Sequence, residues 1–253
     1  MISRVLSGLI AIVFLAVGSV AMAGEPISIA FKPGKEPYVL PKSPFTDADY
    51  IPTNALGIEP EICYQAFKAV GKEIKPVYMN YNRMPTELVA KNIDAATQLV
   101  PDLEDVTYVG GYVHLHDHVI YSLSNDQEIK TIADVAGLRV LAFQQASKFL
   151  GPEYNAAIAT AKSYREIDDQ EKQVQIFLAG RTDVVVLDIG IFKHWSKVYG
   201  EPDKEYGYAS ILGDRFFFSV GFTDPDLAAE FEKGLNIIKE NGTYDKIYAK
   251  YLD

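Results

Sequence analysis

Short apolar strands alternate with helical segments along most of the chain, and this alternation restricts the fold more than any other feature. Residues 183–188 (DVVVLD) are rich in β-branched side chains, whereas residues 60–72 carry apolar side chains at helical spacing. Strands that alternate with helices of about ten residues form parallel sheets from βαβ units. The sequence therefore predicts an α/β protein. The expected strands are 26–31, 75–79, 93–100, 118–123, 138–143, 183–188 and 215–222, and the expected helices include 60–72, 84–92, 170–180 and 226–242.

Two segments repeat one pattern. Residues 87–99 and 176–188 both read as helix, tight turn, Asp, apolar strand and polar residue, with Asp94 at the position of Asp183. Any two helix–strand units share some of these features, so the repeat alone is weak evidence. It suggests two similar lobes whose strands end at a shared cleft, because ligands of open α/β sheets bind beyond the carboxyl ends of the strands.

The first 23 residues have the features of an export signal. Arg4 precedes an apolar run from Val5 to Val20, and Ala21, Met22 and Ala23 form a small-residue cleavage pattern. We expect cleavage after Ala23 and a mature chain in the periplasm of a Gram-negative bacterium. The alternative, an uncleaved membrane anchor, is less favoured because glycines interrupt the run. A mature chain that starts at Gly24 has no cysteine for lipid attachment.

The composition excludes several classes of function. The formal net charge is -10 and no stretch concentrates Lys and Arg, so we exclude a nucleic-acid partner, which needs a basic face. Cys63 is the only cysteine. It cannot form an internal disulfide, and on an apolar helix face we expect an inert thiol rather than a nucleophile. No serine-hydrolase, zinc-protease or phosphate-loop motif occurs, so we expect no catalysis and no cofactor.

Residues 114–118 (HLHDH) hold three of the four histidines of the chain. On one continuous strand, His114, His116 and His118 would point the same way. Two histidines on one strand face, separated by one residue, are a known zinc-binding geometry. Zinc needs three or four ligands, and no further ligand is identifiable, so metal binding by these histidines stays open. We favour a solvated or hinge-lining cluster and expect no metal. Such a cluster would make ligand affinity depend on pH, because imidazole titrates near about pH 6.5.

Five segments spread along the mature chain carry a resemblance to a known family. They match, in order, a helix start, a turn and strand, the entry to a second lobe, an Asp-terminated strand and a closing helix; the segments are 57–71, 90–98, 129–144, 178–188 and 240–252. The chain resembles the bacterial extracellular solute-binding proteins of family 3, the polar amino-acid receptors of ABC transporters. The last segment, ENGTYDKIYAKYL, is the most specific match.

The resemblance implies a two-lobed periplasmic-binding-protein fold of type II, with two hinge crossings and a ligand cleft between the lobes. Lobe 1 is expected to comprise residues 24–119 and 217–253, and lobe 2 residues 120–216, after the signal at 1–23. The two hinge crossings are then expected at 118–123 and 216–222. Hinges absorb the backbone rotation while the lobes move as rigid bodies.

The resemblance also implies where the ligand binds. The family holds an amino-acid ammonium with the Asp that ends a strand of the second lobe, here Asp188, although this residue could also cap the next helix. The family clamp for the carboxylate, hydroxyls and an Arg after the third strand, is eroded here. No Arg occurs between 95 and 138, Gln98 lies near a hydroxyl position, and the acids Asp102, Glu104 and Asp105 occupy the region of the Arg.

Four further residues match positions where the family contacts its ligand. Arg83 follows the second strand and could replace the missing Arg, or form a surface ion pair with Glu87. Ser147 matches a Thr at a helix N-terminus, where backbone N–H groups receive anions, but it could be a plain cap. Tyr38 and Tyr81 follow the first and second strands and match ring walls around the ligand side chain.

The sequence thus predicts a monomeric periplasmic solute-binding protein. It captures a small polar ligand, an amino acid or another amine-bearing compound, for an inner-membrane ABC permease. One alternative is a receptor that signals to a membrane sensor. Another is an enzyme similar to cyclohexadienyl dehydratases on the same fold, which would need a carboxylic acid with a raised pKa facing the ligand.

Overall fold

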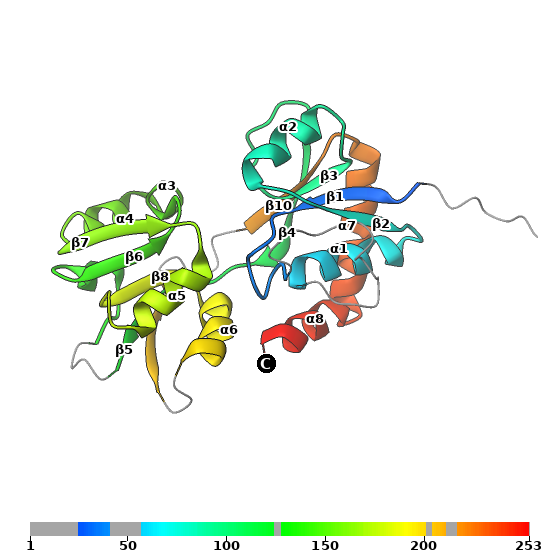
Figure 1. The fold of residues 1–253 in the computed structure, drawn as a ribbon. Coiled ribbons are helices and arrows are strands. Elements are labelled where there is room, and N and C mark those ends of the chain that lie inside the picture. The colour runs from blue at the N-terminus through cyan, green and yellow to red at the C-terminus, as the bar shows by residue number, and fades with distance from the viewer. Residues whose placement is uncertain (1–24, 41–56, 124–127, 201–203, 211–216, 253) are drawn as a thin grey trace, which may run out of the picture.

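The structure is a computed structural model that describes residues 25–40, 57–123, 128–200, 204–210 and 217–252. Two five-stranded sheets, each with its own helices, form two lobes side by side (Figure 1). This arrangement confirms the expected two-lobed α/β fold. The expected export signal lies outside the described residues. Among the residues described, no helix is long and apolar enough to cross a membrane.

The first lobe contains a sheet with the strand order β2-β1-β3-β10-β4. Its strands are β1 (Ile27–Phe31), β2 (Ile74–Tyr78), β3 (Ala95–Leu99), β4 (Thr107–His114) and β10 (Phe217–Phe222). Its helices are α1 (Ile58–Ala69), α2 (Met84–Val89), α7 (Pro225–Glu240) and α8 (Thr243–Leu252). Strand β1 is parallel to β2 and β3, and β10 enters antiparallel beside β3.

The second lobe repeats this plan with the strand order β7-β6-β8-β5-β9. Its strands are β5 (Asp117–Ser122), β6 (Arg139–Phe143), β7 (Ser163–Ile167), β8 (Val184–Asp188) and β9 (Tyr206–Ser210). Its helices are α3 (Ala146–Phe149), α4 (Gly151–Ile158), α5 (Gln170–Leu178) and α6 (Ile189–Tyr199). Strand β6 is parallel to β7 and β8, and β5 lies antiparallel beside β8.

The chain passes from the first sheet to the second between His114, where β4 ends, and Asp117, where β5 begins. The expectation that 118–123 forms a hinge crossing was wrong. These residues belong to β5, which pairs with β8 and β9 along its length because its apolar side chains are buried in the second lobe. Residues 217–222 likewise form β10 inside the first sheet rather than a crossing. The exact limits expected for the lobes stay a prediction.

The core of the first lobe lies between its sheet and the helix pair α1 and α7. A Cβ atom on Gly234 of α7 would lie 2.0 Å from the carbonyl oxygen of Ala66, so only glycine permits this close approach to α1. Cys63 is buried on the same face of α1, and burial raises the pKa of its thiol well above the usual range. A buried thiol of this kind is not an activated nucleophile.

Candidate functional site

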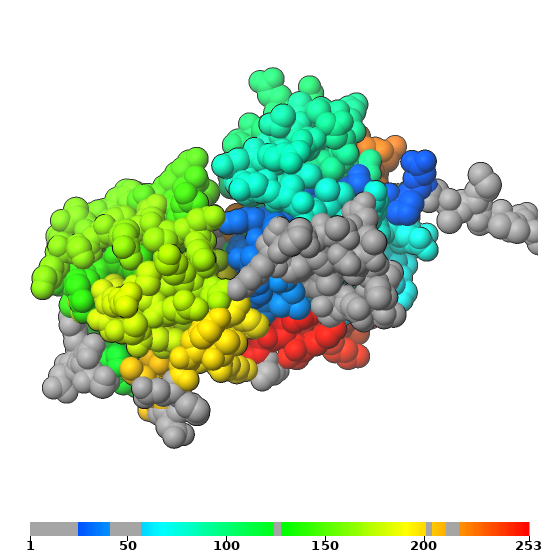
Figure 2. Space-filling model, viewed as in Figure 1, coloured from blue at the N-terminus to red at the C-terminus, as the bar shows by residue number. Residues whose placement is uncertain are grey.

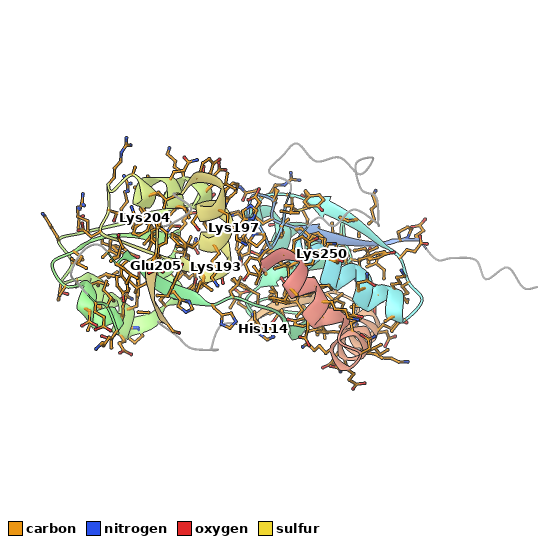
Figure 3. The ribbon with its side chains drawn as sticks, turned by 90° about the horizontal axis from the view of Figure 1, so that it is seen from below. His114, Lys193, Lys197, Lys204, Glu205 and Lys250 are labelled. Carbon is orange, nitrogen blue, oxygen red and sulfur yellow. The ribbon has the colours of Figure 1, made fainter. Side chains whose placement is uncertain are left out.

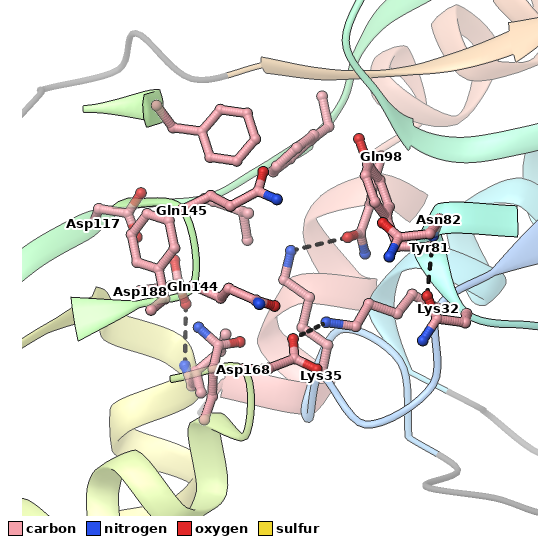
Figure 4. Close-up of a pocket in the computed structure, with 17 residues that line it drawn as sticks. Lys32, Lys35, Tyr81, Asn82, Gln98, Asp117, Gln144, Gln145, Asp168 and Asp188 are labelled. Carbon is pink, nitrogen blue, oxygen red and sulfur yellow. Dashed lines mark hydrogen bonds and ion pairs between the residues drawn. The ribbon is translucent and has the colours of Figure 1, made fainter. Parts of the chain in front are cut away.

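A cavity of about 350 Å³ opens where the two lobes meet. Figure 2 shows this junction, with the segment after β1 in blue between the lobes. The first lobe contributes Lys32, Lys35, Asn80, Tyr81, Asn82, Gln98 and Phe218 to the lining. Facing them from the second lobe are Phe143, Gln144, Gln145, Phe149, Asp168, Gln170, Asp188 and Ile191, with Leu115 and Asp117 at the crossing (Figure 4). Both sides of the lining thus combine polar and charged side chains with aromatic or aliphatic ones.

The first lobe places two lysines in the cavity, both on the segment that follows β1. Lys32 Nζ forms an ion pair across the cleft with Asp168 Oδ1 at 2.8 Å. Lys35 Nζ donates a hydrogen bond to Gln98 Oε1 at 3.2 Å and lies 4.8 Å from the centre of the Phe218 ring. Burial lowers the pKa of Lys35, although Glu59 opposes the shift.

A buried hydrogen-bond chain stands behind Lys35. Gln98 Nε2 donates to Glu59 Oε1 at 2.6 Å, and Tyr112 Oη donates to Glu59 Oε2 at 2.9 Å. The Gln98 backbone N–H donates to Tyr112 Oη at 3.0 Å, which closes the chain. Burial raises the pKa of Glu59, while Lys35 and these hydrogen bonds lower it. Gln98 has a φ of 58°, a left-handed conformation that non-glycine residues rarely adopt.

The second lobe supplies two adjacent carboxyl groups, since Asp117 at the start of β5 pairs with Asp188 at the end of β8. Asp188 is 1% exposed, and its carboxylate accepts from Ile191 N at 3.0 Å and from His116 N at 2.6 Å. Burial raises the pKa of Asp188, and these hydrogen bonds oppose the shift. Burial and the neighbouring Asp188 raise the pKa of Asp117 to about 7, while Lys35 opposes this.

Residues 41–253 match the bacterial extracellular solute-binding proteins, family 3. The chain belongs to this family. It is 25% identical over 229 residues to the arginine-binding extracellular protein ArtP of Bacillus subtilis, which covers 82% of this chain and 84% of that protein.

Solved structures show the same fold as this family-3 protein. An ancestral arginine-binding protein bound to arginine has a TM-score of 0.67 at 18% identity, over 91% of this chain and all of its own. The substrate-binding protein AbpA of an amino acid ABC transporter from Streptococcus pneumoniae, bound to L-arginine, has a TM-score of 0.64 at 14% identity, over 90% and 94% of the chains. A histidine kinase sensor domain has a TM-score of 0.63 at 15% identity, over 91% and 97%.

Three of the six residues expected to bind the ligand of this solute-binding protein line the cavity: Asp188, Gln98 and Tyr81. Asp188 also caps α6, which is the alternative weighed for it. Tyr81 lies on the short turn of helix before α2, where burial raises the pKa of its hydroxyl. Their contact with a ligand stays a prediction.

The other three expected residues lie outside the lining. Arg83 has 67% of its side chain exposed and binds Glu87 Oε1 at 2.8 Å, the surface ion pair weighed as its alternative. Tyr38 is buried, and its hydroxyl donates to the His114 carbonyl at 3.4 Å. Ser147 gives its backbone N–H to Glu166 rather than to the cavity, at 2.8 Å.

The histidines of HLHDH do not gather. The chain changes lobes inside this motif, so no continuous strand aligns their side chains as expected. His114 packs against the ring of Tyr244, 5.9 Å between centroids, on the face seen in Figure 3. His118 Nδ1 lies 2.8 Å from the His116 carbonyl oxygen. No group of three His, Cys, Asp or Glu side chains that could hold a metal occurs in the described part of the chain.

Sequence reasoning missed Lys32, Lys35 and Asp117. The two lysines lie in FKPGKEP, directly after the first strand, so the rule that pointed to Tyr81 and Asp188 applies to them equally. Asp117 stands inside HLHDH, where the histidines drew the interpretation. It is the aspartate of this motif, and not a histidine, that lines the cavity.

Proposed function

We propose that this chain is a periplasmic receptor that captures a small amine-bearing ligand between its lobes and delivers it to an inner-membrane ABC permease. The observation that carries the proposal is the pair of adjacent carboxyl groups, Asp117 and Asp188, in a cavity between two lobes. Asp188 is buried and Asp117 is half-buried, so the two acids repel each other, and a ligand ammonium relieves this repulsion. ArtP is named as an arginine-binding protein, and AbpA was determined bound to L-arginine. Arginine carries an ammonium group, which supports an amine-bearing ligand for this chain.

The cavity supports capture by lobe closure. Its volume of about 350 Å³ suits a small molecule, since ligand pockets span roughly 300–1,000 Å³. Residues of both lobes line it, so a ligand that contacts both favours the closed arrangement by its differential affinity. The alternative partner is a membrane sensor instead of a permease. Identifying which membrane protein of the same organism binds the ligand-bound form distinguishes the two partners.

A thermal-shift screen of residues 24–253 tests the receptor. The panel contains the amino acids, polyamines and small amines, with small carboxylates as comparison. A ligand at about 100 times its Kd stabilises the protein by about 2.7 kcal/mol and raises Tm by several degrees. We expect such a shift with an amine-bearing compound and its loss in Asp188→Asn. No shift with any amine-bearing compound contradicts the proposal.

One observation favours a second function. A carboxylic acid with a pKa of about 7, Asp117, faces the cavity, and this is the property expected of a proton-transfer group in a cyclohexadienyl-dehydratase-like enzyme. Incubation with a cyclohexadienyl substrate then yields an aromatic product, measured by its absorbance, and Asp117→Asn abolishes the turnover. Absence of product at micromolar protein concentration excludes this enzyme.

A further inference from the structure

We propose that the ligand is a hydroxyl-rich amine, an amino sugar or an open-chain amino polyol, whose hydroxyl groups are held by the carboxamide side chains of Asn82, Gln144, Gln145 and Gln170. This inference rests on the proposed receptor function and names the class of ligand. It adds to the acid pair, which takes an ammonium group, a second set of side chains that recognises neutral polar groups.

Carboxamides are the most frequent polar group in the lining of the cavity. They belong to Asn80, Asn82, Gln98, Gln144, Gln145 and Gln170. Two of them already form hydrogen bonds inside the protein. Gln98 binds Lys35 and Glu59, and Asn80 Oδ1 accepts from the Asn82 backbone N–H at 3.0 Å.

The other four carboxamides, those of Asn82, Gln144, Gln145 and Gln170, have no side-chain hydrogen bond among the described residues. Figure 4 shows Gln144 and Gln145 extending from the second lobe into the cavity, with Asn82 on the side of the first lobe. Both lobes thus bring unused amide groups to one cavity. A ligand without neutral polar groups would displace water from these amides without replacing its hydrogen bonds, which weakens binding.

A carboxamide matches a hydroxyl group in both directions. The amide oxygen accepts hydrogen bonds and the NH₂ group donates them, while a hydroxyl both donates and accepts. Neighbouring hydroxyls on a carbon chain or ring therefore bind amides in either orientation. An ammonium only donates and a carboxylate only accepts, so each uses half of what an amide offers. The unused amides thus favour several hydroxyls over a further charged group.

The charged groups of the lining nearly balance one another, which limits the charge of the ligand. The lining holds two lysines and three aspartates: Lys32, Lys35, Asp117, Asp168 and Asp188. Lys32 forms an ion pair with Asp168. Lys35 interacts electrostatically with the other two aspartates and with the buried Glu59. The lining therefore has an excess of at most one negative charge, which one ammonium group offsets. The rest of the ligand is then expected to be neutral, because an unbalanced charge is costly to bury.

Aromatic rings of both lobes face the same cavity. Tyr81 and Phe218 belong to the first lobe, and Phe143 and Phe149 to the second. A sugar or polyol has hydroxyl groups on its edges and C–H groups on its faces. Aromatic rings cover such C–H groups, since the face of the ring is negative and the C–H groups are weakly positive. Rings, amides and one acid pair together fit a hydroxylated amine better than a plain alkyl amine, which has no use for the amides.

Matched compounds test this class of ligand. Glucosamine, galactosamine and mannosamine are compared with cyclohexylamine, which lacks the hydroxyls, and with glucose, in which a hydroxyl replaces the amine. Glucamine, an open-chain amino polyol, is compared with hexylamine and sorbitol in the same way, and L-arginine represents the amino acids. Isothermal titration of residues 24–253 at neutral pH should show at least one hydroxylated amine binding roughly 10- to 100-fold more tightly than its hydroxyl-free amine and than L-arginine, the range for two or three hydrogen bonds.

Variants assign the effect to the carboxamides. Gln144→Met and Gln145→Met keep the length of the side chain and remove the amide. Each should weaken binding of the hydroxylated amine roughly 3- to 10-fold and leave the affinity for cyclohexylamine or hexylamine unchanged or slightly higher. Gln175→Met is the control, because Gln175 is exposed on α5 outside the cavity, with Nε2 at 3.4 Å from Glu171 Oε1. It should leave every affinity unchanged.

The thermal midpoint of each variant shows whether it folds. Gln145 has a left-handed φ of 67°, so Asn82→Leu on the first lobe replaces Gln145→Met if the latter unfolds. Asn82→Leu should cause the same selective loss for the hydroxylated amine.

The outcomes separate this inference from the receptor function. If cyclohexylamine, hexylamine or L-arginine binds as tightly as the hydroxylated amines, the inference is wrong and the receptor function stands. The same holds if the carboxamide variants weaken hydroxylated and plain amines equally. If glucose and sorbitol bind as tightly as the corresponding amines, or if no compound binds, both the inference and the amine receptor are overturned. A loss confined to the hydroxylated amines in the cavity variants supports the inference.

Discussion

The strands β3 and β8 occupy matching places in the two lobes and begin in the same way. Asp94 Oδ2 accepts from Ser28 N at 2.8 Å, and Ser28 O accepts from Asp94 N at 3.0 Å. Asp183 Oδ2 accepts from Arg139 N at 2.7 Å, and Arg139 O accepts from Asp183 N at 3.0 Å. Each aspartate therefore joins its strand to the first residues of the neighbouring parallel strand, β1 or β6.

The same two strands end differently. Strand β3 ends with Gln98 and Leu99, where a strained glutamine turns an amide toward Lys35. Strand β8 ends with Asp188, which caps α6 and lines the cavity. The starts of the strands join neighbouring strands of each sheet, whereas residues at the carboxyl ends line the cavity, where open α/β folds bind their ligands. The sequence repeat thus reflects the shared start of the two strands, and the two segments differ at the strand ends that line the cavity.

The largest expected effect separates the two ends of β8. Asp188→Asn removes the charge that we propose holds the ligand ammonium, and it should weaken ligand binding by about 100-fold or more, since loss of one partner of a buried charge pair costs roughly 2–5 kcal/mol. Asp183→Asn at the start of the strand is the matched control. It should lower the free energy of unfolding, because it weakens the contacts with Arg139, and leave the Kd unchanged. A similar loss of affinity in both variants contradicts the division of roles.

Asp117 should make both stability and affinity depend on pH. Its pKa of about 7 lies above the value near 3.8 of an unperturbed carboxyl, so the stability that comes from the bound proton is complete below about pH 4 and is lost as pH rises through 7. Asp117→Asn should therefore stabilise the ligand-free protein at pH 8 by about 2 kcal/mol, roughly half the full linkage because the carboxyl faces a solvent-accessible cavity, and have little effect at pH 4.

Ligand affinity should change in the opposite sense. An ammonium binds the ionised pair better, so the Kd should fall up to about tenfold for each unit from pH 5 to 7 and then level off. Asp188 and Lys35 interact electrostatically with Asp117, so the slope belongs to the cluster rather than to one residue. Titration calorimetry across this range measures the slope. A slope that is unchanged in Asp117→Asn contradicts this assignment.

Asp94 and Asp183, which each join two neighbouring strands, should contribute similarly to the free energy of unfolding. Asp94→Ala and Asp183→Ala each remove a carboxylate that binds a neighbouring strand, and each should lower the free energy of unfolding by about 1–2 kcal/mol in urea denaturation. Asp183 also binds the Arg139 guanidinium, with Nη2 to Oδ1 at 2.6 Å, so its effect should be slightly larger. If one substitution is silent, the matched geometry of the two lobes does not carry matched energies.

The smallest effect is expected at Arg83, the residue that sequence reasoning offered for the missing clamp. Its ion pair with Glu87 is exposed, and such pairs contribute about 0–1 kcal/mol. Arg83→Ala should change neither the Kd nor, by more than about 0.5 kcal/mol, the stability. A tenfold loss of affinity would instead place Arg83 at the ligand in the closed form.

Local patterns in the sequence specified most elements and few contacts. Central strands such as β8 and the helix α1 follow from their apolar periodicity, because both are buried. Strand β4 was missed because Gly110 and Gly111 interrupt its pattern, and the edge strands β7 and β9 were missed because their alternation is weak.

The site was harder to predict, for a physical reason. Asp188 and Tyr81 were found because each lies at or near the carboxyl end of a strand and matches a family position, which are local signals. The contact between Lys35 and Gln98 joins residues 63 positions apart, and that between Lys32 and Asp168 joins residues 136 apart. Only the tertiary packing of the chain brings such pairs together, so the sequence of one short segment does not indicate these contacts.

The ion pair between Lys32 and Asp168 has a consequence for timing. Both groups are partly exposed, so the pair adds little to equilibrium stability. It nevertheless joins the two lobes, and in the proposed receptor an opening of the cleft must separate this pair before the ligand leaves. The residence time of the ligand then depends partly on this ion pair. Dissolved salt weakens such a pair, since the Debye length is about 10 Å at 0.1 M ionic strength. The proposed receptor should release its ligand faster at high ionic strength than at low ionic strength.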